Sequence, residues 1–159
     1  MKAADIMRRK LVMISPEATA REAFELMRAH DHAALPVVDE QRRLVGIVTE
    51  ADLLRLALPR YLDALGDVSF LPAEFEPYKR AIDRVRDVRV REFMSRKDAP
   101  VADENDSIVE VARIICELQV RRVPIVRDGR LVGLITRKDL MREIVEPAVT
   151  GEGRPSGKS

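Results

Sequence analysis

Two stretches of the chain carry apolar residues at helical spacing. Each stretch opens with a hydroxyl residue that is followed three positions later by Glu, as in Thr19 with Glu22 and Ser107 with Glu110. This capping-box pattern marks a helix start. The apolar positions then follow the i, i+3, i+4, i+7 spacing of a helix that buries one face. The predicted core-facing sets are Ala20, Ala23, Phe24 and Met27 in the first helix and Ile108, Val111, Ala112 and Ile115 in the second.

A hairpin is predicted after each of these helices. Two β-branched runs flank a polar turn in each case, and Asp128-Gly129 is a strong turn signal. A second helix is predicted after Thr49 and after Thr136, ending near Pro59 and Pro147 respectively. With a short leading strand, each half has the order β-α-β-β-α. The predicted strands lie near 11–14, 35–38 and 44–49, and near 100–102, 123–126 and 131–136.

The two halves are copies of one another. Leu44–Leu53 matches Leu131–Leu140 at six of ten positions, at an offset of 87 residues. A three-stranded sheet covered on one side buries too little to be stable alone, so we expect the copies to pack sheet against sheet as a pseudo-two-fold pair. The predicted class is α/β of the α+β type. Its parts are repeat 1 (1–58), an inter-repeat segment (59–89), repeat 2 (90–147) and a flexible tail (148–159).

Each repeat also carries the tetrad Thr-x-x-Asp, as Thr49 with Asp52 and Thr136 with Asp139. One interpretation is structural: Thr at N-cap and a carboxylate at N3 start a helix. The other is chemical, because a helix start favours phosphate and a carboxylate can accept two hydrogen bonds from a ribose diol. Both interpretations place the carboxylates at an exposed helix start. The residues by themselves leave the two open.

The order helix, Leu-Pro-Val-Val, turn, Leu-Val-Gly-Ile-Val-Thr-x-x-Asp-Leu, present twice, resembles a pair of cystathionine β-synthase (CBS) domains over about 4–58 and 90–146. The resemblance implies clefts between the repeats that bind adenosine-type ligands. Each cleft would combine the Thr-x-x-Asp of one repeat with the first strand and the residues before Leu-Pro of the other. Site A would then use Ile47, Thr49, Asp52, Ala99, Pro100, Val101, Arg121, Arg122 and Lys138, and site B would use Leu134, Thr136, Asp139, Leu11, Val12, Met13, Ala33 and Ala34.

The two implied sites differ in charge. Arg121 and Arg122 belong to site A, whereas Ala33 and Ala34 occupy the matching place in site B. Guanidinium groups suit phosphate oxygens, so site A is expected to prefer phosphorylated ligands. Site B is expected to bind weakly charged adenosyl compounds, to bind more weakly than site A, or to stay empty. A solvated charged turn is the alternative for the two arginines. The basic run 8–10 is interpreted as solvated, and contact with phosphates at the mouth of a cleft is the alternative.

Composition narrows the classes of function. The chain has 159 residues, 46% hydrophobic and 35% charged, with a net charge of +1, which disfavours nucleic-acid binding through a large basic face. One cysteine, Cys116, excludes a disulfide framework and is expected to be a small buried residue. His30 and His32 have no partner ligands in the sequence, so no metal site is predicted. No apolar stretch is long enough to span a bilayer, and we expect a soluble, cytoplasmic protein.

The inter-repeat segment contains four of the six aromatic residues. The spacing of Phe75, Tyr78, Ile82 and Val85 predicts a helix over about 74–87. A flexible linker would hold few aromatics, so this segment is expected to pack on its own repeats or on another molecule. A homodimer is expected.

No catalytic set of residues occurs at plausible spacing, so the sequence predicts a non-catalytic regulatory module with no required cofactor. Its predicted ligand is an adenine nucleotide, AMP or ATP foremost, with ADP or a related adenosyl compound as other members of the class. The alternatives are a ligand-free module for dimerisation or for binding another protein, and a nucleic-acid-binding regulator.

Overall fold

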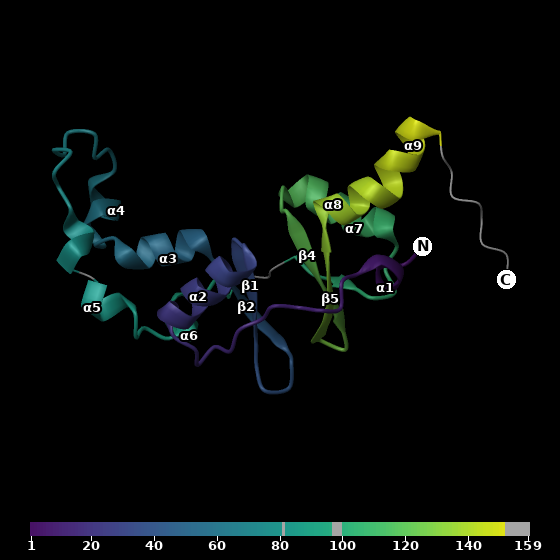
Figure 1. Cartoon of the computed structure of the whole chain (residues 1–159), viewed down its shortest axis with the longest axis horizontal. Helices are drawn as coiled ribbons and strands as arrows, with labels where there is room; N and C mark the ends of the chain where they lie inside the picture. The colour runs from purple at the N-terminus through teal and green to yellow at the C-terminus, as the bar shows by residue number, and fades with distance from the viewer. Residues whose placement is uncertain (81, 97–99, 152–159) are drawn as a thin grey trace. The chain divides into compact units, whose positions relative to one another are not determined.

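The computed structural model describes residues 1–80, 82–96 and 100–151, and it is a mixed α+β structure with two small sheets (Figure 1). The predicted α+β class is confirmed. The chain forms two compact units: unit 1 is Met1–Leu11 with Pro100–Ser159, and unit 2 is Val12–Ala99. The predicted sheet-to-sheet packing of the repeats stays a prediction.

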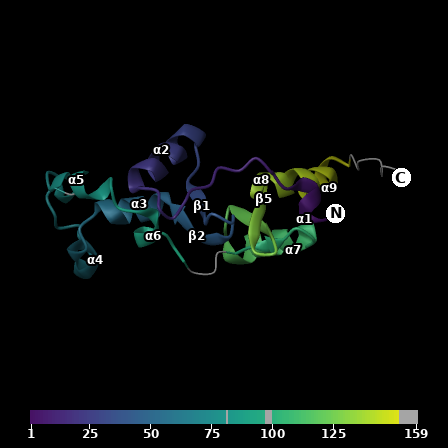
Figure 2. The ribbon, with the colours of Figure 1, turned by 90° about the horizontal axis from the view of Figure 1, so that it is seen from below.

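Unit 2 is built around a two-stranded antiparallel sheet, in which Leu35 pairs with Val48. The expected leading strand is reduced to one parallel bridge between Ile14 and Val37. Figures 1 and 2 show the inter-repeat segment, with α4 and α5, beyond the end of α3. The elements are α2 (Ala20–His30), β1 (Ala34–Val38), β2 (Leu44–Thr49), α3 (Glu50–Ala57), α4 (Tyr61–Leu65), the 3-10 helix η1 (Pro77–Arg80), α5 (Ile82–Val85) and α6 (Val90–Phe93).

Unit 1 has the fuller sheet, in the order β3-β4-β5. Ala102 pairs in parallel with Ile125, at the place that corresponds to the Ile14 bridge in unit 2. Asp128 and Gly129 both have positive φ, as the predicted tight turn requires. The elements are α1 (Ala3–Ile6), β3 (Ala102–Asp103), α7 (Ile108–Leu118), β4 (Arg122–Arg127), β5 (Arg130–Thr136), α8 (Arg137–Leu140), the π-helical η2 (Met141–Val145) and α9 (Glu146–Thr150).

The two repeats exchange the segments that precede their first strands. We call these segments, residues 1–11 and 90–96, the leading segments. Arg8 and Leu134 exchange backbone hydrogen bonds of 2.9 and 3.1 Å, so the segment after α1 lies along β5 of the second repeat. Ser95 and Ile47 do the same at 2.9 and 3.0 Å, which places the segment after α6 along β2 of the first repeat. Each compact unit therefore combines the body of one repeat with the leading segment that the sequence assigns to the other.

This exchange explains a glycine in each sheet. A Cβ on Gly46 would lie 2.8 Å from the carbonyl oxygen of Ser95, and a Cβ on Gly133 would lie 2.9 Å from the Cβ of Met7. The leading segment crosses the strand too closely for any side chain at these positions. The matching glycines in the repeated motif thus serve the close approach of backbone segments.

Each unit has its own hydrophobic core, and the leading segments contribute to both. Ala3 and Met7 join the core of unit 1, and Val90 joins that of unit 2. The other buried members are Ala102, Ile108, Val111, Ile115, Val123, Ile125, Ile135 and Leu140 in unit 1, and Ile14, Ala23, Met27, Leu35, Val37 and Val48 in unit 2.

Two side chains that were expected in the core are exposed. Phe24 is 52% exposed, with the guanidinium of Arg28 stacked 5.6 Å from its ring centroid. Its helix buries the smaller Ala20 and Ala23, together with Met27, and leaves Phe24 at the edge of the apolar stripe. Cys116 is also exposed, because it follows the buried Ile115 by one position and so lies about 100° further around the helix.

Three predicted segment boundaries differ from the structure. The expected helix over 74–87 is replaced by η1 and α5, with residue 81 outside the described part of the chain. The second helix of repeat 2 does not end near Pro147, because Pro147 occupies the first turn of α9, where proline is tolerated. The helix ends at Thr150, so the first residues of the expected tail are helical, and 152–159 lie outside the described residues.

We predict that Gly133→Ala lowers the free energy of unfolding by about 1–3 kcal/mol, because the new methyl group overlaps the Met7 side chain. Adding Met7→Ala removes the Sδ and Cγ atoms that obstruct it. The double mutant is then expected to lose at least about 0.5 kcal/mol less free energy of unfolding than the sum of the losses in the two single mutants, as measured by urea unfolding.

The matched control is Gly46→Ala with Met94→Ala. There the nearest obstacle is the Ser95 carbonyl oxygen, which shortening Met94 leaves in place, so the coupling is expected to be smaller. An unchanged urea midpoint for both glycine variants would contradict the close approach of the leading segments.

Candidate functional site

The start of α8 in unit 1 is organised by the side chains of Thr136 and Asp139. The Thr136 backbone N–H and hydroxyl donate to Asp139 Oδ2 at 2.9 and 2.7 Å. The Asp139 backbone N–H donates back to Thr136 Oγ1 at 3.3 Å. The capping-box interpretation of this tetrad is therefore confirmed. The capping box occupies Oδ2 of Asp139. What the other oxygen, Oδ1, can bind depends on its neighbours.

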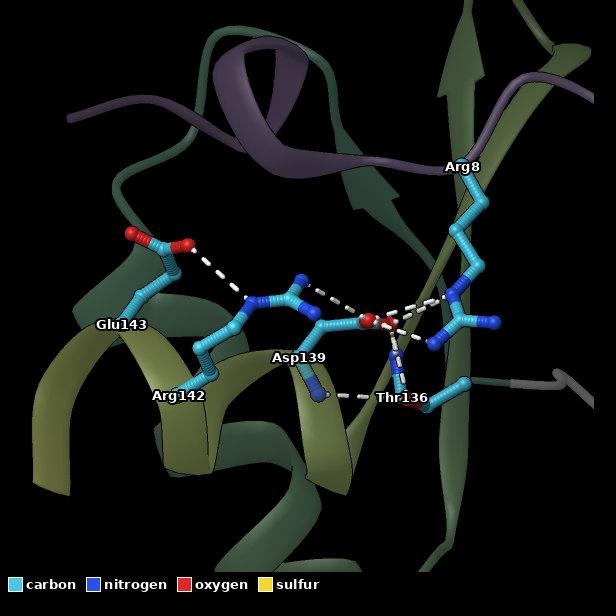
Figure 3. A network of polar contacts seen from close by, with 5 residues as sticks. All are labelled: Arg8, Thr136, Asp139, Arg142 and Glu143. Carbon is cyan, nitrogen blue, oxygen red and sulfur yellow. Dashed lines mark hydrogen bonds and ion pairs between the residues drawn. The ribbon is translucent and has the colours of Figure 1, made fainter. Parts of the chain in front are cut away.

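Those neighbours are two arginines, which approach Asp139 from opposite sides (Figure 3). Arg8, from the leading segment, donates from Nη2 to Oδ1 at 2.8 Å and from Nε to Oδ1 and Oδ2 at 3.1 and 3.2 Å. Arg142, from η2, donates to Oδ1 at 3.4 Å and also pairs with Glu143. The side chain of Asp139 is 1% exposed, whereas that of Arg8 is 56% exposed.

The ion pair sets the charge state of the carboxyl group. Burial, the largest influence, acts to raise the pKa of Asp139, but hydrogen bonds from Arg8 and Thr136 and the charge of Arg8 outweigh it. The net result is a pKa below the ordinary value. The pKa of Arg8 is raised in turn, chiefly by its hydrogen bond to Asp139. At neutral pH the pair is a carboxylate and a guanidinium.

In unit 2 the same tetrad starts α3 with a different set of partners. The Thr49 backbone N–H and hydroxyl donate to Asp52 Oδ2 at 2.8 and 2.9 Å, and Arg55 donates to Oδ1 at 2.6 Å. Arg55 corresponds to Arg142. The residue that corresponds to Arg8 is Ser95, and among the described residues no guanidinium of the leading segment contacts Asp52.

The expectation that both carboxylates are exposed is wrong. Asp52 and Asp139 are 7% and 1% exposed, because each folds back over the first turn of its own helix. They are the only buried charged residues in the described part of the chain. A change to Ala there removes acceptors from buried donors, which costs more than the loss of a surface cap.

The residues before Leu-Pro lie beside the tetrad of their own repeat. Arg122 is paired opposite Thr136 in the sheet, and Arg137 N–H donates to the Arg121 carbonyl at 3.1 Å. In the same way Ala34 is opposite Thr49, and the Ala33 carbonyl accepts from Glu50 at 3.0 Å. The crosswise combinations in sites A and B remain predictions.

Arg122 lies in an unusual electrostatic setting. It is half-buried, and burial, followed by the charges of Arg121 and Arg8, lowers its pKa below the ordinary value. Its neighbourhood therefore brings three guanidinium groups together within unit 1. Of these, Arg8 is the one that has a carboxylate partner among the contacts of the described residues.

The remaining predicted residues are spread over both units. Lys138 and Val101 are exposed, and Ala99 lies outside the described residues. The structure brings together Thr136, Asp139, Arg121 and Arg122 in unit 1. It also adds Arg8, which was expected in solvent. The sequence does carry a signal at this position. The repeat offset of 87 aligns Arg8 with Ser95, so the two repeats differ in charge there. Half-buried predicted residues are Leu11, Val12, Met13, Ala33, Ala34, Ile47, Pro100 and Leu134.

The described residues have neither a metal-binding cluster nor a membrane-spanning helix. They contain no group of three or more His, Cys, Asp or Glu side chains that could hold a metal ion. No helix among them is long and apolar enough to cross a bilayer.

Comparison with known proteins identifies the family. The CBS domain model matches residues 3–58 and 90–146. The chain therefore belongs to the CBS domain family and carries two CBS domains in tandem, which confirms the resemblance drawn from the repeated motif.

Several known proteins match most of this chain. A CBS domain-containing protein of Dictyostelium discoideum is 33% identical over 144 residues, covering 89% of each chain. Hypoxic response protein 1 of Mycobacterium tuberculosis is 29% identical over 147 residues, which are 92% of this chain and 87% of the relative. The crystal structure of Arabidopsis thaliana CBSX2 in complex with AMP matches with a TM-score of 0.68 and 25% identity, over 92% of this chain and 98% of that one.

The buried ion pair predicts a pH dependence of stability. Because the pKa of Asp139 is lower in the folded chain than the value near 3.8 of the free side chain, its ionised form stabilises the fold above about pH 4. That contribution is lost as the pH falls through the folded pKa. We expect the stability difference between the parent and Asp139→Asn, measured by urea unfolding, to be constant near neutrality and to shrink below about pH 4.

Asp139→Asn keeps an acceptor for the Thr136 N–H, so the variant is expected to fold. Asp5→Asn, near the surface of α1, is the control for a general carboxylate effect. A difference between the parent and Asp139→Asn that persists unchanged to pH 2 would show that ionisation of Asp139 does not stabilise the fold.

Proposed function

We propose that this chain is a non-catalytic regulatory module that binds adenosine-type nucleotides, AMP or ATP foremost, in clefts between its two CBS domains. The observation that carries the proposal is the pair of buried aspartates, Asp52 and Asp139, each fixed at a helix start by a threonine. CBS pairs are generally regulatory, and a relative with the same organisation has been crystallised with AMP.

The chemistry of the tetrad supports a ribose contact. Thr49 and Thr136 use Oδ2 of their aspartates, so Oδ1 is the oxygen that a ribose diol would approach. A carboxylate held in a fixed orientation loses little freedom when a ligand binds, which favours affinity. Asp52 and Asp139 are therefore proposed as the ribose-binding residues of sites A and B.

The phosphate contacts are proposed to come from Arg121 and Arg122, with Lys138 from the same repeat. Arg122 is partly withdrawn from water beside two other guanidinium groups, and an anionic ligand would relieve this repulsion. Guanidinium–phosphate hydrogen bonds are strong and directional. The apolar members, such as Ile47 and Leu134, would contact the base.

Binding of AMP and adenosine, measured by calorimetry, tests this proposal. Arg121→Ala combined with Arg122→Ala is expected to weaken AMP binding at least about tenfold and to change adenosine binding little. Raised salt should act in the same direction. Asp52→Asn and Asp139→Asn are each expected to remove one binding event.

Equal losses for AMP and adenosine in the arginine variant would mean that the arginines shape the pocket without contacting phosphate. If the parent binds no adenine nucleotide, the proposal fails, and the alternative of a ligand-free interaction module gains support. Nucleotide retained through purification and identified by mass spectrometry would name the ligand directly.

We also propose that the chain assembles as a homodimer. In unit 2 a cavity of about 800 Å³ opens between α2, α3 and the inter-repeat segment. Phe24, Leu54 and Tyr78 line it and are 52%, 65% and 44% exposed. An apolar surface of this kind in an isolated chain favours association, and two-fold symmetry is the usual outcome. Another protein could occupy the same surface in place of a second copy.

Light scattering tests the assembly. The parent is expected at twice the chain mass of 18.0 kDa at micromolar concentration. Leu54→Glu should shift it toward the monomer, because a charge on the apolar surface is costly to bury. Val149→Glu, on exposed α9, is the matched control and should leave the mass unchanged. A monomeric parent would refute the proposal.

A further inference from the structure

The two buried aspartates differ in how far their acceptor positions are filled. A carboxylate offers about four lone-pair positions. Among the described residues, six polar contacts converge on Asp139: three from Arg8, two from Thr136 and one from Arg142. Three converge on Asp52: two from Thr49 and one from Arg55. Asp52 can therefore accept a further hydrogen bond as it stands, whereas Asp139 cannot.

The difference comes almost entirely from Arg8. Its guanidinium contacts both oxygens of Asp139, and Figure 3 shows it on the side of the carboxylate opposite to Arg142. Arg142 has a counterpart in Arg55, but Arg8 has Ser95 in its place. A ribose hydroxyl can reach Asp139 only if the guanidinium of Arg8 turns away.

Arg8 is able to turn. Its side chain is 56% exposed, so most of it is already in water, and its backbone stays fixed by the two hydrogen bonds to Leu134. The cost of turning is electrostatic. Away from Asp139, the guanidinium of Arg8 would remain near Arg122, whose charge it already opposes. A phosphate group beside Arg8 would remove that cost, because it replaces the carboxylate as the anion that pairs with this guanidinium.

We propose that Arg8 makes the Asp139 site selective for phosphorylated nucleosides: it occupies the carboxylate until a ribose replaces it, and it then pairs with the phosphate of the same ligand. This inference rests on the proposed function. A nucleoside without phosphate must break the ion pair and leave Arg8 beside Arg122 with no anion. A nucleotide also breaks the ion pair between Arg8 and Asp139, but its phosphate then forms a new ion pair with Arg8.

This changes the expected ligand of the site. Ala33 and Ala34 led to the prediction of a weakly charged adenosyl compound at site B. With Arg8 in place, the Asp139 half of that site has its own guanidinium, and the preference there turns toward phosphate. At the Asp52 site no arginine of the leading segment has to turn away among the described residues, so that site would accept a ribose directly.

The test uses chains in which only one aspartate is intact. In an Asp52→Asn background, calorimetry is expected to show AMP binding at least about tenfold more tightly than adenosine. Adding Arg8→Ser, which copies the residue at position 95, should strengthen adenosine binding and bring the two affinities within about threefold of each other. Arg9→Ser is the matched control: it removes the same charge one position away, where the guanidinium contacts the carbonyl of Ala4, and it should leave the ratio unchanged.

A second readout does not require a ligand. Carboxyl NMR titration should show a higher pKa for Asp139 in Arg8→Ser than in Arg9→Ser, because the largest of the influences that lower it is lost. A purely structural role of Arg8 would also raise this pKa, but it would not strengthen adenosine binding. An AMP-to-adenosine ratio that is the same in Arg8→Ser and Arg9→Ser therefore overturns the proposal.

An Asp139→Asn chain separates this inference from the proposed function. If AMP binds to that chain, but neither ligand binds to the Asp52→Asn chain with or without Arg8→Ser, the inference is overturned and nucleotide binding at the Asp52 site stands. If no chain binds either ligand, both are overturned. If adenosine binds only after Arg8→Ser, the inference is supported in its strongest form.

Discussion

The exchange of leading segments is the constraint on which the rest of the structure depends. Backbone pairing of Arg8 with Leu134, and of Ser95 with Ile47, gives each sheet a neighbour from the other repeat. It requires a glycine at the point of closest approach and carries Met7 and Val90 into the two cores. It also delivers Arg8 to Asp139. The packing within each unit and the chemistry of the candidate site therefore share one cause.

The candidate site also shows how one group can serve structure and chemistry together. Asp139 caps its helix with one oxygen and holds Arg8 mainly with the other. Because the group is buried, its orientation is fixed by the fold, and the same burial makes an unpaired charge there costly. The tetrad in the other repeat has the same cap without the second arginine, so duplication has preserved the scaffold while the charges around it have diverged.

The sequence predicted local structure well, because periodicity and capping act over a few residues. The α2 and α7 helices, both hairpins and the two Thr-x-x-Asp caps were predicted by such patterns, and the duplication led to the family. Exposure of Phe24 and Cys116 was missed, because burial depends on neighbours that a helical stripe does not specify. The contact between Arg8 and Asp139 joins residues 131 positions apart, and no local pattern indicates it. The inter-repeat segment is not part of the repeated motif, so no second copy was available for comparison, and its division into η1 and α5 was not predicted.

The exchanged segments also bear on the order in which the chain folds during synthesis. Unit 2 is continuous in sequence, from Val12 to Ala99, so all of its core is available once that stretch has left the ribosome. Unit 1 is discontinuous. Its first eleven residues are made first but find their sheet only when β5 has been synthesised, and closing so long a loop is slow. Until then Ala3 and Met7 lack the core that they join. Residues 1–11 are thus the last part of unit 1 to be secured, although they precede the rest of that unit in the sequence.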